Sequence, residues 1–88
     1  MYRLILPPKF KKQFRDFLKR HPELRKAVEE KFFILEKNPR DPRLKTHKLS
    51  GALKGFLAAS ITNEYRIVFH FSEGGIFLFA IGTHDEVY

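Results

Sequence analysis

The last third of the chain carries the clearest hydrophobic pattern. Residues 65–71 and 76–81 are rich in β-branched and aromatic residues, and a Ser-Glu-Gly-Gly segment connects them. Two such runs around a Gly-containing connection predict a β-hairpin. The second run is apolar on both faces, which is typical of an interior strand. In the first run the side chains alternate between two faces, with Tyr65, Ile67, Phe69 and Phe71 on one face and Arg66, Val68 and His70 on the other.

The first half of the chain predicts two helices. From Pro8 to Arg20 the apolar residues recur at positions i, i+4, i+7 and i+8, the spacing of one helical face. His21-Pro22 interrupts this pattern, and Pro22 suits the first position of a second helix that runs to about Lys37. Because the link is so short, the helices are expected to form an antiparallel pair.

Two further extended segments complete the predicted elements. Residues 1–6 read as a short strand ended by Pro7-Pro8, and residues 56–61 read as a strand before the hairpin. The basic segment 40–55 shows no regular pattern. The order β-α-α-β-β-β predicts one α+β domain over residues 1–88, in which a two-helix hairpin packs on one face of a small, mainly antiparallel sheet. The other face, which carries Arg66, is expected to stay partly open.

The composition restricts the possible chemistry. Eighty-eight residues suit a single core that buries roughly 60–70% of the chain's surface. The chain has no Cys, which rules out disulfides and thiolate chemistry. No apolar run approaches the ~20 residues of a membrane span, and no signal peptide opens the sequence. We therefore expect a cytoplasmic protein without a membrane partner.

The net charge of +7 is unevenly distributed. Residues 1–55 hold 16 Lys and Arg against 6 Asp and Glu, whereas residues 56–88 hold 1 against 4. A front half with a balance of +10 indicates a polyanionic partner, either nucleic acid or an acidic protein segment. A basic surface that serves only solubility is the simpler alternative.

Arg66 is the leading candidate for chemistry. It is the only basic residue after position 55 and lies within a predicted strand. An Arg there must be paired or reach solvent, because an unpaired buried charge is very costly. One interpretation is a salt bridge to Glu64 or Asp85. The other is a guanidinium fork that holds a phosphate on the open face of the sheet.

Several further residues could accompany Arg66. His84 can transfer protons near neutral pH, and Tyr88 can stack on a base or donate from its hydroxyl. His47 lies in the basic segment, where it is either a solvated loop residue or a second proton carrier. His21 and His70 are interpreted as structural. Four His without the spacing of metal ligands predict no metal site, and no cofactor is expected.

Lysines and arginines form two further groups. The basic segment contributes Lys45, Lys48 and Lys54 as candidate contacts to RNA phosphates. The first predicted helix presents Lys11, Arg15 and Lys19 at helical spacing. Such a face is most often simply solvated, but it also suits an RNA backbone or an acidic partner.

Three local motifs together resemble the RelE/ParE superfamily of toxins, nearest to its RelE/YafQ-like branch. They are His47-Lys48-Leu49-Ser50-Gly51 followed by Lys54-Gly55, then residues 65–69, then Gly82-Thr83-His84-Asp85-Glu86-Val87-Tyr88. The resemblance extends over the whole chain in length, charge and element order. It implies the toxin of a type II toxin–antitoxin system, which cleaves mRNA on the ribosome, inhibits translation and is neutralised by a cognate antitoxin.

The resemblance also implies residue roles. Arg66 matches the strand Arg that contacts the scissile phosphate, His84 the C-terminal catalytic His, and Tyr88 the aromatic that stacks on the message. His47 matches a loop His, and Glu64 falls near an acidic active-site residue. The implied reaction is metal-free attack by the RNA's own 2′-OH, with Lys48 or Lys54 supporting Arg66, His84 as general acid, and either His47 or Glu64 as base. The helix residues Lys11, Arg15 and Lys19 are expected to bind the antitoxin.

Two departures from the pattern affect the expected activity. The YafQ-like branch has another His where this chain has Ser60, and RelE itself has an Arg near the position of His84. The expected proton relay is therefore shorter and the rate lower. Two alternatives remain open at this stage: a ParE-like toxin without nuclease activity that acts on DNA gyrase, and a non-catalytic protein that is basic because it binds an acidic antitoxin.

Overall fold

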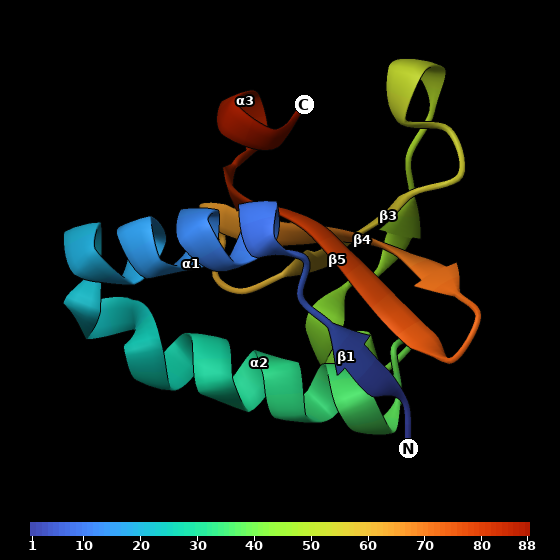
Figure 1. The fold of residues 1–88 in the computed structure, drawn as a ribbon, viewed down its shortest axis with the longest axis horizontal. Helices are drawn as coiled ribbons and strands as arrows, with labels where there is room; N and C mark the ends of the chain where they lie inside the picture. Colours follow the sequence, from blue (N-terminus) through green and yellow to red (C-terminus); the bar gives the residue numbers. More distant parts are fainter.

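Two helices pack against one face of a five-stranded sheet (Figure 1). The computed structural model describes residues 1–88. The strands are β1 (Arg3–Ile5), β2 (His47–Lys48), β3 (Leu57–Ser60), β4 (Tyr65–Ser72) and β5 (Gly75–Thr83), and the helices are α1 (Pro8–Arg20), α2 (Arg25–Lys37) and α3 (His84–Val87). The strand order is β1-β5-β4-β3-β2, and only the β1–β5 pair is parallel. The predicted α+β class, with its helical hairpin and mainly antiparallel sheet, is confirmed.

The helices follow the predicted periodicity closely. Phe10 and Phe17 of α1 are buried, and Phe14 stacks on Phe32 of α2 with ring centres 5.3 Å apart. The start of α2 differs slightly from the prediction, because Pro22–Leu24 form a 3₁₀ turn before the α-helix begins at Arg25. Figure 1 shows α1 and α2 running in opposite directions, as expected for so short a link.

The β4–β5 hairpin positions the rest of the sheet. Ile67 and Phe69 enter the main core and Val68 the opposite face, which confirms the predicted alternation. Val68 pairs with Ala80 but Phe69 pairs with Leu78, so Phe79 is an extra bulged residue and remains 43% exposed. Gly74 adopts a φ of 89° in the turn, a conformation that glycine reaches without strain.

The second face of the sheet is only partly open. Val68 and Ala80 form a small cluster there with Val87 of α3, and Leu49 and Phe56 pack against it. In Figure 1, α3 and the turn formed by residues 51–53 rise from this side of the sheet, opposite the two long helices. The uncovered part of this face therefore lies between α3 and the edge strand β2.

The basic segment 40–55 is more regular than the sequence predicted. It contains β2 and two 3₁₀ turns, Pro42–Leu44 and Gly51–Leu53. Strand β2 has only two residues, His47 paired with Ala58 and Lys48 paired with Leu57, so it shows no detectable periodicity in the sequence. The sheet consequently has one strand more than predicted.

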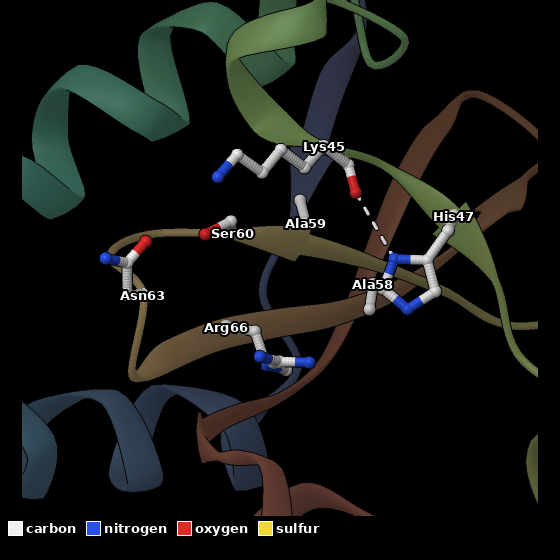
Figure 2. Close-up of a pocket in the computed structure, with 7 residues that line it drawn as sticks. All are labelled: Lys45, His47, Ala58, Ala59, Ser60, Asn63 and Arg66. Atoms are coloured by element: carbon white, nitrogen blue, oxygen red, sulfur yellow. Dashed lines mark hydrogen bonds between the residues drawn. The ribbon is translucent and has the colours of Figure 1, made fainter.

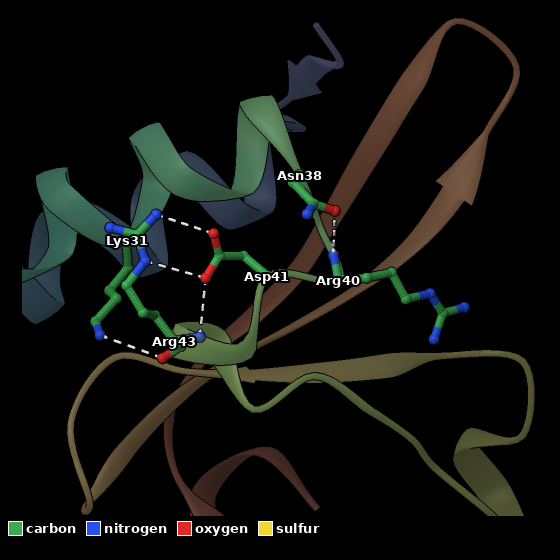
Figure 3. Close-up of polar contacts among 5 residues, drawn as sticks. All are labelled: Lys31, Asn38, Arg40, Asp41 and Arg43. Carbon is green, nitrogen blue, oxygen red and sulfur yellow. Dashed lines mark hydrogen bonds and ion pairs between the residues drawn. The ribbon is translucent and has the colours of Figure 1, made fainter.

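An ion pair holds the start of this segment (Figure 3). The Arg43 Nε and Nη2 donate to the two oxygens of Asp41 at 3.0 and 2.9 Å, and the Arg43 backbone N–H donates to the same carboxylate at 2.9 Å. The Arg43 hydrogen bonds, from the side chain first, lower the pKa of Asp41 to about 2. No helix has the length and apolar character needed to cross a bilayer.

Candidate active site

A hollow of about 290 Å³ lies on the open part of the second face (Figure 2). It brings together residues from β2, β3, β4 and the adjoining turns: Lys45, His47, Ala58, Ala59, Ser60, Asn63 and Arg66. The sheet register explains this arrangement. His47 pairs with Ala58, and Ser60 pairs with Arg66, so these side chains point to one face across three neighbouring strands.

Arg66 lies in this hollow without an acidic partner. The ion pairs of the protein are formed by other residues, so neither Glu64 nor Asp85 pairs with Arg66 as the simpler interpretation required. Its Nε is buried and makes no hydrogen bond. Leaving a buried donor unpaired costs about 1–3 kcal/mol, and more for a charged group. An arginine in this state is well prepared to bind an anion such as a phosphate.

His47 lies in the same hollow in a defined orientation. Its Nδ1 is 3.2 Å from the backbone oxygen of Lys45 (Figure 2). Because a carbonyl oxygen only accepts, Nδ1 must carry the proton in this hydrogen bond. Nε2 of the neutral ring then keeps its lone pair, as a general base requires.

The C-terminal helix α3 brings His84 and Tyr88 close to Arg66. The His84 and Tyr88 rings meet edge to face with centres 4.3 Å apart, and the Arg66 guanidinium carbon lies 5.8 Å from the centre of the Tyr88 ring. Both rings are exposed, and the His84 Nδ1 lies 3.6 Å from the Asp85 carboxylate. The predicted residues Arg66, His84, Tyr88 and His47 therefore gather on one side of the sheet.

A capping box fixes the start of α3. The Thr83 backbone N–H donates to the Glu86 Oε1 at 2.8 Å, and the Glu86 backbone N–H donates to the Thr83 hydroxyl at 3.3 Å. The first of these bonds is the main reason that the pKa of Glu86 is lowered. A Cβ at Gly82 would lie only 3.0 Å from Glu86 Oε1, so the glycine allows the carboxylate to approach. These contacts orient His84 and Tyr88.

Glu64 does not join this arrangement. It is exposed in the turn before β4, where its backbone N–H donates to the Thr62 hydroxyl at 3.2 Å. It does not line the hollow that holds Arg66 and His47. Ser60 donates its hydroxyl to the Thr62 backbone oxygen at 2.7 Å. Its hydroxyl therefore stabilises the turn.

The three candidate lysines of the basic segment separate into two places. Lys45 lines the hollow with Arg66, whereas Lys48 and Lys54 line a different hollow. The reason is the alternation along β2, which turns Lys48 to the face opposite His47. The structure therefore places Lys45, and not Lys48 or Lys54, in the hollow of Arg66.

Asn63 is a lining residue that the sequence analysis missed. It lies in the tight turn between β3 and β4 and faces the hollow with its amide group (Figure 2). Its place between Ser60 and Arg66 in the sequence was the available signal, but turns favour Asn for backbone reasons alone. On α1, the exposed residues Lys11, Arg15 and Lys19 make no ion pair. No group of three or more His, Cys, Asp or Glu is arranged to hold a metal ion.

Solved structures of bacterial toxins share this fold. A copper-bound mutant toxin from Helicobacter pylori is 27% identical with a TM-score of 0.81, and the match covers 100% of both chains. YafQ from Escherichia coli is 18% identical with a TM-score of 0.82, covering 100% of this chain and 99% of that one. In the E. coli DinJ–YafQ toxin–antitoxin complex the match is 18% identical with a TM-score of 0.79 and covers 99% and 97%.

The sequence comparisons concern the family directly. No curated protein sequence matches the chain at a significant level. A family model described as the bacterial toxin of a type II toxin–antitoxin system, YafQ, matches residues 2–88. That match extends from before β1 to the last residue and includes the whole candidate site. The chain therefore belongs to the YafQ family of bacterial toxins of type II toxin–antitoxin systems.

Proposed function

We propose that this toxin is an endoribonuclease that cleaves mRNA on the ribosome and thereby inhibits translation. The observation that carries the proposal is the unpaired Arg66 in one hollow with His47, beside the His84–Tyr88 pair. An anion-binding fork flanked by two imidazoles and an aromatic ring suits a phosphodiester of a single RNA strand. Membership of the YafQ toxin family supports the same class of activity.

In the proposed reaction the RNA supplies its own nucleophile. A base removes the proton of the 2′-OH, the 2′-oxygen attacks the adjacent phosphorus, and the bond from phosphorus to the 5′-oxygen breaks. An acid gives a proton to that 5′-oxygen. The products are a 2′,3′-cyclic phosphate and a free 5′-hydroxyl. Negative charge builds on the phosphate oxygens in the transition state, where positioned cations have their largest effect.

The geometry supports one assignment of these roles. Arg66, with Lys45 nearby, binds the phosphate oxygens. His47 is the base, because its Nδ1 is engaged with the Lys45 carbonyl and its Nε2 is free, whereas Glu64 lies outside the hollow. His84 is the acid, and Tyr88 stacks on a base of the message next to the cleaved bond.

The site is sparse, which supports a requirement for the ribosome. His84 begins a four-residue helix and Tyr88 follows its end, and both side chains are exposed. His47 and Lys45 in the hollow are exposed as well. Such a site provides little orientation for a flexible RNA. Seating of the message in the ribosomal A site would supply that orientation, and correct orientation is worth up to ~7–11 kcal/mol of a reaction barrier.

The proposed partner that neutralises the toxin is a cognate antitoxin. The E. coli relative is known in complex with DinJ, and a Staphylococcus aureus structure contains YoeB with YefM. In this chain the exposed α1 residues Lys11, Arg15 and Lys19 provide a basic surface for an acidic, partly disordered segment that folds on binding.

Cleavage in a purified translation system tests the proposed function. A labelled mRNA is incubated with the toxin, either alone or on translating ribosomes, and the fragments are mapped at their ends. The proposal expects fragments with cyclic phosphate and 5′-hydroxyl ends on ribosomes and little cleavage of free RNA. Efficient cleavage of purified RNA would contradict the requirement for the ribosome. Intact mRNA under both conditions would contradict the nuclease activity.

A further inference from the structure

A second basic hollow, of about 440 Å³, lies at the β2 edge of the sheet. Arg40, Lys48 and Lys54 line it together with the aromatic rings of Phe56 and Phe71. Lys48 pairs with Leu57, whose side chain enters the main core, so Lys48 points to the helix-covered face. Phe56 and Leu49 also line the hollow but pack against the cluster on the second face, so the hollow lies across the edge of the sheet. The hollow of Arg66 and His47 lies on the second face and shares no lining residue with this one.

The cations of this second hollow have no acidic partners. No Asp or Glu lines it, and none of its three basic side chains forms an ion pair. Arg43 provides the contrast, because its guanidinium is engaged with Asp41. Figure 3 shows the Arg40 side chain extending away from that pair, while the Arg40 backbone N–H is held by the Asn38 side chain at 3.1 Å. Three positive charges thus converge without compensation.

The aromatic walls of the hollow are supported from behind. Phe71 is 42% exposed, and the centre of its ring lies 5.9 Å from that of Tyr2 and 6.0 Å from that of Phe69, which it meets at a right angle. Phe56 is held by Phe79 at 4.8 Å and His70 at 5.1 Å between ring centres. An exposed aromatic face beside several cations is the usual composition of a surface that binds single-stranded nucleic acid by base stacking and phosphate contacts.

We propose that this second hollow binds a single-stranded RNA segment separate from the phosphodiester that is cleaved. Arg40, Lys48 and Lys54 contact backbone phosphates, and a base stacks on Phe71. Because the two hollows share no lining residue, the catalytic groups are free when the second hollow is occupied. The inference deepens the proposed function, since it identifies a second point at which the toxin holds RNA.

Binding of a non-cleavable RNA tests the proposal separately from catalysis. The probe is a fluorescent single-stranded 2′-O-methyl oligonucleotide, which keeps the phosphates and bases but has no 2′-OH to attack. Anisotropy gives the Kd across a salt series for the wild type and for Arg40→Ala/Lys48→Ala/Lys54→Ala. Three lost phosphate contacts are expected to weaken binding about 100-fold at 0.1 M salt and to lower the slope of log Kd against log salt by about 2.

Two matched variants make the test specific. Lys9→Ala/Lys12→Ala/Lys26→Ala removes the same charge from exposed helix residues that line no hollow and make no ion pair, and it should leave the Kd nearly unchanged. Phe71→Leu keeps an apolar side chain without a stacking ring and should weaken binding about 5- to 150-fold. Thermal melting confirms that each variant is folded.

Three results would overturn the inference. The wild type could fail to bind the oligonucleotide, the two triple variants could lose affinity equally, or the hollow variant could lose antitoxin affinity and keep RNA affinity. The last result would make an acidic protein segment the occupant. The proposed function is tested separately by the cleavage assay, because Arg66→Ala should lower cleavage about 10²–10³-fold while retaining most of the affinity for the probe.

Discussion

The guanidinium carbon of Arg66 lies 5.8 Å from the centre of the Tyr88 ring, so the middle of the sheet meets the last residue of the chain. The Tyr88 ring also meets His84, with ring centres 4.3 Å apart. A phosphate held by Arg66 would therefore lie near both a proton donor and an aromatic surface for the neighbouring base. Substitution of Arg66, His84 or Tyr88 should therefore affect cleavage in a different way for each residue.

Replacement of Arg66 should impair catalysis and leave the fold intact. Arg66→Ala is expected to lower ribosome-dependent cleavage about 10²–10³-fold, since it removes a cation that acts on transition-state charge. The free energy of unfolding should change by less than about 1 kcal/mol, because Arg66 makes no ion pair. Arg66→Lys keeps the charge without the fork and should retain part of the activity. A large loss of thermal stability in Arg66→Ala would instead make Arg66 a structural residue.

A matched pair of variants identifies the base. His47→Ala should lower cleavage about 10²–10⁴-fold, the usual contribution of general base catalysis. Glu64→Gln should stay within a few-fold of the wild type, because Glu64 is exposed outside the hollow. Single-turnover cleavage on ribosomes measures both variants. The reverse result, an active His47→Ala and an inactive Glu64→Gln, would transfer the role to Glu64.

His84 and Tyr88 should separate into chemistry and positioning. His84→Ala is expected to cost about 10²–10⁴ in cleavage rate through loss of the proton donor. Tyr88→Ala loses the stack on an RNA base, which should weaken the toxin's interaction with the message by ~1–3 kcal/mol. Tyr88→Phe keeps the ring and should cleave at nearly the wild-type rate. If Tyr88→Phe is as impaired as Tyr88→Ala, the hydroxyl takes part in the reaction and stacking is not its main role.

The Thr83–Glu86 capping box should be required for a correctly placed α3. Thr83→Ala is expected to destabilise the helix by about 0.5–2 kcal/mol and to lower cleavage, although Thr83 touches no reacting atom. Ser50→Ala is the control, since Ser50 precedes the Gly51–Leu53 turn without a side-chain capping bond. Hydrogen exchange of the α3 amides and the cleavage rate are measured for both variants. Faster exchange in α3 of Thr83→Ala without a lower cleavage rate would contradict this role.

The same box predicts a direction for the pH dependence of α3. The pKa of Glu86 is lowered from 4.5 in the fold by its bond from Thr83, so its contribution to stability is complete above the unfolded value. That contribution should be lost as the pH falls below 4.5 and through the lowered folded pKa. The wild type should therefore lose α3 protection in acid, and Glu86→Gln should show a smaller change.

Charge on α1 should control antitoxin binding. Lys11→Glu/Arg15→Glu/Lys19→Glu is expected to weaken the complex and to reduce its sensitivity to salt, because fewer ion contacts form. Isothermal titration at two salt concentrations gives both quantities. An unchanged Kd and an unchanged salt slope would show that the antitoxin binds elsewhere on the toxin.

Local patterns in the sequence were sufficient for most of the elements. The spacing of Phe10, Phe14 and Phe17 placed α1, and strict alternation from Tyr65 to Phe71 gave the facing of β4. These signals are strong because the segments are long enough to repeat their period several times. Strand β2 has two residues and no period, and for that reason it was missed.

The sequence by itself determined which residues have reactive side chains, and the three motifs indicated Arg66, His47, His84 and Tyr88. Only the tertiary structure decided how they are grouped. Register between β2, β3 and β4 brought His47 to the hollow of Arg66, left Glu64 outside and turned Lys48 to the opposite face. Such grouping depends on hydrogen bonds between segments far apart in the chain, and a shift of one residue reverses the facing of every side chain in a strand.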